Sequence, residues 1–307
     1  MPFLCDFHAH STASDGILTP AELVREAHRC GVDVLALTDH DDVSGIGEAR
    51  ACAEELGLEL LPGIELSVSE QDAKQQMHIL GLGIDPSSHL LLERVVEFRR
   101  TRSERAQLIV ERLEQLGFSL SFERLRESAR GAALGRPHVA RALVEAGICS
   151  SPNDAFARFL RRGRPAYVPR EGLDASQAIS LIHDAGGIAS LAHPPRSLGV
   201  DAAGGLQNFV ARLVPLGLDG IEVYHPSHTQ ADRKRMRRLA CVYDLVVTGG
   251  SDFHGDEKPA ARPGRGRGHL ALGREFYDAI QERLAERSGS GAKLTPIQPP
   301  STLARPA

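Results

Sequence analysis

The chain has 307 residues, of which 42% are hydrophobic and 25% charged, and its formal net charge is −4 at pH 7. This composition is typical of a soluble globular protein. The small negative charge excludes a strong global attraction to nucleic acid or anionic membranes, although it leaves room for a local basic patch. The sequence contains no stretch with the length and apolarity of a membrane-spanning helix, and its start lacks the pattern of a signal peptide. We therefore expect a cytoplasmic protein with no membrane partner and no obligate protein partner.

The first part of the chain alternates between strand and helix patterns. A strong helix start is predicted at Thr19. Thr19 as the N-cap and Glu22 three residues later make a capping box, and Pro20 occupies the first helical position. Runs of branched apolar residues predict buried strands around this helix. Strands are expected at 2–7, 32–40, 58–66 and 77–84, and helices at 19–31 and 45–57.

Residues 86–169 are predicted to be almost wholly helical, which interrupts the alternation. The first helix of this stretch has a 3.6-residue apolar period with many arginines on its other face. Glutamates are interleaved with these arginines, so a solvated face is favoured over a track for RNA. The arginines in question are Arg99, Arg100, Arg102 and Arg105. We interpret residues 86–169 as a helical insertion that forms a cap over the substrate.

Alternation resumes after the insertion and predicts an α/β domain made of residues 1–85 and 170–287. The last segment, 288–307, is rich in Ser, Gly and Pro and is expected to be disordered. Helices are expected at 175–187, 205–217, 229–244 and 274–287, and strands at 187–195, 218–226 and 245–254. About seven strands separated by helices predict a parallel architecture, for which a closed barrel and an open sheet are both possible.

The positions of the polar residues favour the barrel. Histidines or carboxylates follow nearly every strand, whereas an open sheet would focus its site between two strands. The residues expected to converge are His8, His10, Asp15, His40, Glu65, His78, His193, Asp252 and His254. His78 does not fit this pattern, since it precedes its apolar run and would lie at the start of a strand. Six imidazoles and three carboxylates in one place would be costly without cations, and mixed ligands of this kind suit Zn²⁺, Mn²⁺ or iron.

The chain resembles the PHP (polymerase and histidinol phosphatase) family of metal-dependent phosphoesterases. The resemblance rests on the motifs "DFHAHSTASDG", "TDHDD", "GIELS", "MHIL", "AHPP" and "GSDFH", which occur in order between residue 3 and about residue 255. It implies a distorted (β/α)7 barrel with a helical insertion. The segments "GRPHVARALVEAG" and "AYVP" of the insertion are similar to the branch that includes 3′,5′-nucleotide bisphosphate phosphatases and a 5′-to-3′ exoribonuclease.

The resemblance also implies three metal sites, with three Mn²⁺ expected and Fe²⁺ or Zn²⁺ as alternatives. The first site would be held by His8, His10, Glu65 and Asp252; the second by Glu65 as a bridge with His78 and His193; the third by Asp15, His40 and His254. For Asp6 and Asp39 two readings stay open: either residue orients a ligand histidine from behind, or it has a purely structural role.

Cations on loops facing the barrel mouth are expected to contact phosphate. Arg136 is the first candidate, because it opens a helix whose N-terminus adds to the attraction for an anion. Arg196 follows the "AHPP" motif, and His138, His225 and His228 are candidates for phosphate contact or protonation of the leaving group. Tyr167 either stacks on a base or packs over the edge of the core.

These observations predict an enzyme that removes the 3′-phosphate of a nucleoside 3′,5′-bisphosphate, converting adenosine 3′,5′-bisphosphate to AMP and phosphate. A small nucleotide with one or two phosphates is therefore the expected ligand. The alternatives are a 5′–3′ exoribonuclease acting on short RNA, a histidinol-phosphate phosphatase and a non-enzymatic metal-binding PHP module. An open basic channel would favour RNA, and a closed pocket with one base stack would favour the nucleotide.

Overall fold

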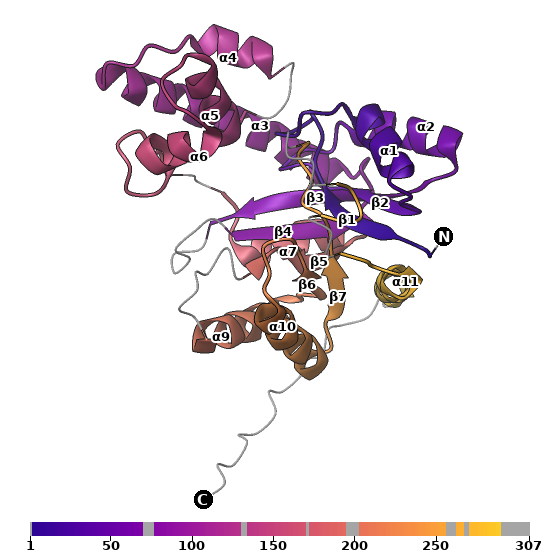
Figure 1. The fold of residues 1–307 in the computed structure, drawn as a ribbon. Coiled ribbons are helices and arrows are strands. Elements are labelled where there is room, and N and C mark those ends of the chain that lie inside the picture. Colours follow the sequence, from indigo (N-terminus) through magenta and orange to yellow (C-terminus); the bar gives the residue numbers. More distant parts are fainter. Residues whose placement is uncertain are drawn as a thin grey trace, which may run out of the picture.

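The computed structural model describes residues 2–69, 77–129, 134–169, 172–194, 203–255, 262–266 and 270–289. Seven strands in these ranges form one sheet in the order β1-β2-β3-β4-β5-β6-β7, and the sheet curves into a nearly closed barrel (Figure 1). The strands are β1 (Cys5–Ala9), β2 (Val34–Leu37), β3 (Glu59–Val68), β4 (Met77–Leu82), β5 (Ile188–Leu191), β6 (Gly220–Tyr224) and β7 (Val246–Gly249). The expected strand number and barrel class are confirmed.

The barrel comes closest to closure where β1 meets the segment that follows β7. The N–H of Asp252 donates to the His8 carbonyl at 2.8 Å, and the N–H of His10 donates to the Phe253 carbonyl at 2.9 Å. Ala9 and Phe253 also form a parallel bridge. This seam brings the two ends of the barrel sequence together, so motifs some 245 residues apart along the chain lie side by side.

Strand β4 is antiparallel to both of its neighbours, β3 and β5, whereas the other neighbouring strands pair in parallel. The start of β4 therefore lies at the same rim as the C-terminal ends of the parallel strands. Within β4, His78 pairs in register with Ser67 near the end of β3. The antiparallel direction of β4 explains why His78 lies at the barrel mouth although it stands at the start of its strand.

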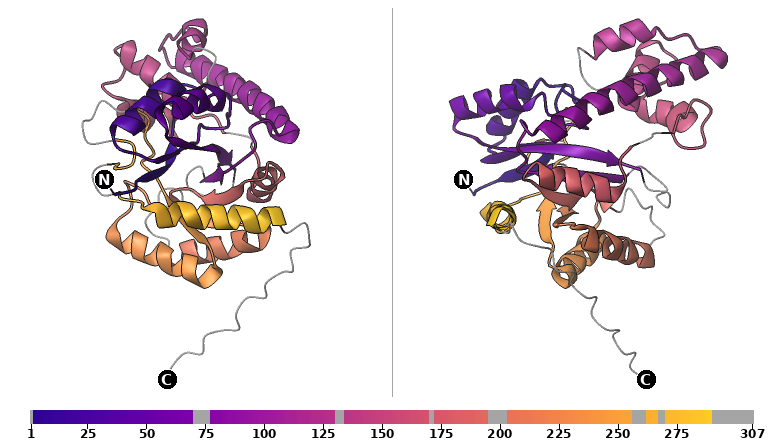
Figure 2. Two further views of the ribbon diagram at one scale, coloured as in Figure 1. Left: turned by 90° about the vertical axis from the view of Figure 1, so that its right-hand side faces the viewer. Right: turned by 180° about the vertical axis from the view of Figure 1, so that it is seen from behind.

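Helices cover the outside of the barrel (Figures 1 and 2). They are α1 (Pro20–Arg29), α2 (Ile46–Leu56), α7 (Ala175–Asp184), α9 (Ala203–Leu213) with the 3₁₀ turn η2 (Val214–Leu216), α10 (Gln230–Tyr243) and α11 (Arg274–Gly289). Helix α1 begins with the expected capping box of Thr19 and Glu22. One buried cluster joins the strands to α1, α2, α7, α9 and α10, and another joins them to α11 through Ile280. Burial of these apolar faces is the main stabilising contribution and fixes the strand ends relative to one another.

The chain between β4 and α7 forms a group of helices beyond one side of the mouth, with a core of its own (Figure 2). These are α3 (His89–Gln115), α4 (Phe122–Ser128), α5 (Arg136–Glu145), α6 (Pro152–Ala155) and the π-helical turn η1 (Phe156–Leu160). Helix α3 is shared between two cores: Leu91, Val95 and Phe98 pack on the barrel, whereas residues from Ala106 onward pack within the insertion. The separate core supports the predicted insertion, and α3 connects it to the barrel.

The expectation that the α3 arginines form a solvated face is wrong for Arg102. Its side chain is 8% exposed and pairs with Asp41 of the loop after β2. Arg99 pairs with Asp42 of the same loop, and the half-buried Arg105 donates from Nε to the Val168 carbonyl at 3.0 Å. Arg100 behaves as expected, being exposed and paired with Glu104. The acids lie some 60 residues from their partners, so the local charge pattern of the helix could not reveal them.

No helix in the described residues combines the length and apolarity required to cross a membrane. Arg196 lies outside the described residues, as does the predicted tail apart from its first two residues, which end α11.

Candidate metal centre

The C-terminal end of β1 presents two imidazoles to the barrel mouth. His8 lies in β1 and His10 directly follows it, and both are completely buried. Their ring centroids are 5.1 Å apart, because residues i and i+2 of a strand point to the same side. The segments that follow β5 and β7 also present site residues. Their backbone lies in the left-handed region, with φ of 28° at His193 and 49° at Asp252. Such conformations are unfavourable for these residue types and persist where the surrounding structure enforces them.

Glu65 of β3 lies at the centre of the imidazole cluster and divides it between its two oxygens. Oε1 is 2.7 Å from His78 Nδ1 and 2.9 Å from His193 Nε2. Oε2 faces the other imidazoles, at 3.2 Å from His8 Nε2, 3.2 Å from His10 Nε2 and 3.0 Å from His40 Nδ1. A carboxylate in this position can bind one cation with each oxygen.

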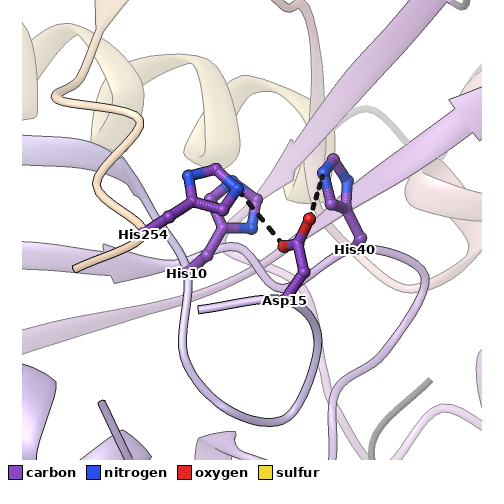
Figure 3. Close-up of side chains that lie close together, drawn as sticks. All are labelled: His10, Asp15, His40 and His254. Atoms are coloured by element: carbon purple, nitrogen blue, oxygen red, sulfur yellow. Dashed lines mark ion pairs between the residues drawn. The ribbon is translucent and has the colours of Figure 1, made fainter. Parts of the chain in front are cut away.

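Three groups of ligand atoms lie close enough to hold a cation each, with the atoms in a group within 4.8 Å of one another. The groups are His8, His10, Glu65 and Asp252; His40, Glu65 and His78; and His10, Asp15, His40 and His254. The last of these is shown in Figure 3, where His254 and His40 approach Asp15 from two sides. The structure thus brings together all nine residues expected from the sequence, with His193 joining through Glu65.

Several buried nitrogen and oxygen atoms of this cluster form no hydrogen bond with any residue that the structure describes. These atoms are His8 Nε2, both ring nitrogens of His10, His40 Nδ1, His78 Nδ1, His193 Nδ1 and Glu65 Oε2; where they approach Glu65 closely, the angles are not those of a hydrogen bond. Unsatisfied polar atoms cost free energy and are rare in native proteins, so a concentration of them requires an explanation. Metal coordination provides one, since imidazole nitrogens and carboxylate oxygens are ligands for Zn²⁺, Mn²⁺ and iron.

The electrostatics of the cluster favour positive charge. Burial acts to raise the pKa of Glu65, Asp15 and Asp252, but the surrounding histidines hold it well below its usual range. Burial acts to lower the pKa of His8, yet Glu222, Glu65 and Asp252 raise it well above normal. The carboxylates therefore stay ionised and attract cations, and protons and metal ions compete for the same nitrogen atoms.

His78 differs from its neighbours. Burial lowers the pKa of His78 to about 4, despite the opposing attraction of Glu65. The side chain is therefore neutral near pH 7, which is the protonation state that binds metals.

Glu222 of β6 is a site residue that the sequence reasoning did not include in the ligand set. Its Oε1 lies 2.9 Å from His8 Nδ1, and its Oε2 accepts from the N–H of His193 at 2.7 Å. It is fully buried, and although burial opposes this, the nearby His8 and His225 lower its pKa to about 2. A glutamate within the predicted sixth strand was a visible signal, but only the nearly closed barrel places it behind His8.

Asp6 and Asp39 act through backbone and serine contacts instead of through ligand imidazoles. Asp39 accepts from the N–H of Ser11 at 2.8 Å and from the Ser14 hydroxyl at 2.6 Å, so it holds the loop that presents Asp15. Asp6 accepts from the N–H groups of His8 at 3.2 Å, Ser251 at 2.8 Å and Gly264 at 2.6 Å. It secures the seam of the barrel beside the cluster.

Two of the candidates for substrate contact lie beside the cluster. His225 Nε2 is 3.2 Å from Asp252 Oδ2, and the His225 ring is 5.4 Å from that of His193. His228 lies 5.1 Å from His225, ring to ring, and bonds the Val223 carbonyl through Nδ1. The Nε2 atom of His228 is buried and unpartnered. Burial lowers the pKa of His228 to about 4, so this ring is neutral near pH 7.

The other candidates are carried by α5 of the insertion. His138 Nδ1 accepts from the N–H of Gly135 at 3.2 Å, and burial lowers its pKa to about 4 even though Asp15 opposes the shift. The guanidinium of Arg136 lies 5.7 Å from the Phe156 ring and 5.9 Å from the Tyr167 ring. The Tyr167 ring thus lies against the Arg136 guanidinium at the edge of the insertion core. This contact is compatible both with stacking on a base and with packing over the core edge.

Comparisons with known proteins agree with this geometry. The PHP domain model matches residues 6–130. The 5′–3′ exoribonuclease Rnm of Escherichia coli is 40% identical over 252 residues, covering 81% of this chain and 84% of the relative. The 3′,5′-nucleoside bisphosphate phosphatase of Chromobacterium violaceum is 36% identical over 251 residues, covering 81% and 86%.

A solved structure from Bifidobacterium adolescentis, assigned as a metal-dependent phosphoesterase, superposes with a TM-score of 0.81 at 32% identity. It covers 92% of this chain and 98% of its own. The order of the motifs, the seven-stranded barrel and the extent of these matches lead to one conclusion: the chain belongs to the PHP-domain family.

Proposed function

We propose that this protein is a metal-dependent phosphoesterase that hydrolyses the 3′-phosphate of a nucleoside 3′,5′-bisphosphate, giving a 5′-mononucleotide and phosphate. The observation that carries the proposal is the position of Glu65, whose two carboxylate oxygens face two different sets of imidazoles. Closely spaced cations that share a carboxylate are a recurring arrangement in enzymes that cleave phosphate esters.

The proposed ligands form three overlapping sets. The first set is His8, His10, Glu65 and Asp252; the second is Glu65, His78 and His193; the third is Asp15, His40 and His254. His10 and His40 lie close enough to serve a neighbouring set as well. Manganese is the expected metal, with iron or zinc as alternatives, because mixed imidazole and carboxylate ligands suit all three.

When bound, divalent ions at such a site supply Lewis-acid charge for phosphoryl oxygens and lower the pKa of a water molecule. The residues of the chain have separate tasks. Glu222 keeps His8 Nδ1 engaged, which leaves Nε2 directed at the ligand cluster. Because Nδ1 of the neutral His228 ring donates to the Val223 carbonyl, its unpartnered Nε2 is an acceptor beside the cluster, where it could bind a hydroxyl group of the substrate. Arg136 on the insertion supplies positive charge for a second phosphate.

The proposed substrate class follows from the bond that is cleaved, because the activities named for two relatives break the same bond. A 3′,5′-bisphosphate phosphatase breaks the bond between O3′ and phosphorus of a nucleotide that already carries a 5′-phosphate. An exoribonuclease that releases 5′-mononucleotides from the 5′ end breaks the same bond, with the rest of the RNA attached to that phosphorus. One site can therefore accept both, and the non-enzymatic alternative is disfavoured because relatives of this chain carry enzyme names.

Short RNA is the second candidate substrate, and the surface of α10 favours it. Lys234, Arg235, Arg237 and Arg238 are all exposed, and none of them forms an ion pair with any residue that the structure describes. By contrast, the exposed Arg29 of α1 and Arg100 of α3 are each paired with a glutamate of their own helix. Helix α10 lies on the side of the barrel away from the insertion (Figure 1), and Arg233 in its first turn reaches the His225 carbonyl at 3.5 Å. An RNA strand that leaves the barrel mouth on the side of α10 would meet this positively charged face.

The direct test is a comparison of steady-state hydrolysis of four substrates by the metal-loaded protein: adenosine 3′,5′-bisphosphate, AMP, histidinol phosphate and a short 5′-phosphorylated RNA. We expect the bisphosphate to have the highest kcat/KM, well above the values for AMP and histidinol phosphate. Turnover of the RNA alone would overturn the leading assignment and leave the second. A matched Arg136→Ala variant should lose kcat/KM strongly with unchanged metal content, because Arg136 is assigned to substrate and not to metal.

A further inference from the structure

Arg102 of α3 reaches from the insertion into the loop that carries His40. Its Nε donates to Asp41 Oδ2 at 2.8 Å, and its NH2 group also bonds that oxygen. The same NH2 lies 3.3 Å from the Ser67 hydroxyl oxygen. All three side chains are buried, with 8% of Arg102, none of Asp41 and 2% of Ser67 exposed. A buried ion pair of this kind costs desolvation, so its geometry and partners must explain its presence.

Asp41 connects two segments that present metal-centre residues. It directly follows His40, and its backbone lies in the left-handed region with φ of 54°. Its Oδ1 accepts from the N–H of Ser67 at 2.9 Å, two residues after Glu65, and its own N–H donates to the Glu65 carbonyl at 3.0 Å. The Asp41 carboxylate therefore holds the His40 loop against the end of β3.

The guanidinium of Arg102 also lies beside the start of α5. A Cβ atom placed on Gly135 would lie 3.0 Å from Arg102 NH1, which is tighter than an ordinary contact. Gly135 is the N-cap residue of α5 and directly precedes Arg136. One side chain thus bonds the loop of His40 and the strand of Glu65 and lies beside the helix that carries the proposed phosphate contact.

We propose that Arg102 is a positioning residue that fixes His40 relative to Glu65 through Asp41, and so sets the affinity of the metal centre. The inference rests on the proposed metal-dependent function. The planar guanidinium is suited to this task, because it binds a carboxylate and a hydroxyl in one fixed geometry. Residues that hold ligands in place from behind typically change metal affinity or activity by about 10–100-fold when altered.

The test uses the double variant Arg102→Met/Asp41→Asn, which removes both charges together and leaves no unpaired buried charge. We expect a thermal midpoint close to that of the wild type. Calorimetric titration of the metal-free protein with Mn²⁺ should show at least one binding step weakened by about 10-fold or more. The kcat for the bisphosphate should fall at low Mn²⁺ and recover as Mn²⁺ is raised, a response that general damage to the fold would not give.

Arg99→Met/Asp42→Asn is the matched control. Arg99 lies one turn earlier on α3 and pairs with the next residue of the same loop, at 2.6 Å from Nε to Asp42 Oδ2. The Asp42 carboxylate is bonded to Ser44 of its own loop, and its described contacts do not include the strand of Glu65. This control should bind Mn²⁺ within about twofold of the wild type.

Two results would overturn the inference: wild-type Mn²⁺ affinity in Arg102→Met/Asp41→Asn, or equal weakening in both double variants. The second result would assign the effect to the whole contact between α3 and the loop. If the wild-type chain itself takes up no divalent metal, the proposed function fails, and with it this inference; that failure is visible before any variant is compared.

Discussion

Glu222 Oε1 lies 2.9 Å from His8 Nδ1 at the base of the metal centre, and both side chains are fully buried. The contact joins a residue of β6 to a residue of β1, 214 positions earlier in the chain. It fixes the ring of His8 so that Nε2 faces Glu65 and Asp252. The proposed ligands are thus supported by a carboxylate that is itself not proposed to touch metal, which is a common arrangement for ligand histidines.

Replacing Glu222 by Gln should lower Mn²⁺ affinity and kcat/KM by about 10–100-fold, because the amide loses the charge that holds His8. Metal content after dialysis and steady-state hydrolysis of the bisphosphate measure the two effects. Asp219→Asn is the control, since Asp219 makes a similar contact to His183 Nε2 at 2.8 Å beyond the opposite end of β6. If both variants lose metal equally, the effect belongs to the stability of the barrel and not to His8.

Replacing Gly250 by Ala should displace β1 and weaken metal binding. A Cβ atom at position 250 would lie 2.3 Å from His8 Cβ and 2.5 Å from the His8 backbone nitrogen, so backbone must move. We expect a loss of about 1–3 kcal/mol in the free energy of unfolding, as for other overpacked sites, measured by urea titration. Gly47→Ala in α2 meets nothing within 4 Å and should instead stabilise the protein by ~0.5–1 kcal/mol. Unchanged stability in the Gly250 variant would contradict this account of the seam.

Cys5 should resist thiol reagents in the folded protein at pH 8. Burial, assisted by the charges of Asp33 and Asp6, raises the pKa of the Cys5 thiol to about 12. The thiolate is the reactive form, so at pH 8 the thiol is almost entirely protonated and gains reactivity only well above that pH. Cys241 is exposed and should react first with a chromogenic disulfide. Mass spectrometry would identify the modified residue; modification of Cys5 before Cys241 would count against the described packing.

Neutralising the α10 face should separate the two candidate substrates. In Arg235→Gln/Arg237→Gln/Arg238→Gln we expect kcat/KM for the bisphosphate to stay within twofold of the wild type. The kcat/KM for a short 5′-phosphorylated RNA should fall, and its salt dependence should flatten by up to about 2 in the log–log slope, at ~0.7 per phosphate contact. The control neutralises Arg29, Arg94 and Arg100, which are already paired with glutamates. Equal effects of both triple variants on RNA would exclude a specific role for α10.

Much of the candidate site could be predicted because its signals are local. The i, i+2 spacing of His8 and His10 at the end of an apolar strand predicts that both rings point one way. The same reasoning placed Glu65 and His193 at the ends of buried strands, and the alternation of strands and helices predicted the barrel. His78 was anomalous in this scheme, because strand direction depends on pairing with neighbours and is not written in the residues of the strand itself.

The contacts that support the site could not be predicted in this way. Arg102 looked like part of a solvated face, since the glutamates near it in sequence suggested local pairing. Its partner Asp41 lies 61 residues away, and only the crossing of α3 over the rim brings the two together. Glu222 was visible as a carboxylate in a predicted strand, but its partner depends on the position of β6 relative to β1.

The sequence by itself determined which residue types stand at the strand ends, and therefore the ligand chemistry and the fold class, because both follow from patterns a few residues long. The tertiary structure decided which of those groups lie close enough to share a cation, which oxygen of Glu65 each imidazole faces, and which side chains stand behind the proposed ligands. Those relations are distances between segments far apart in the chain, and they are set only when the apolar faces pack and the seven strands nearly close on themselves.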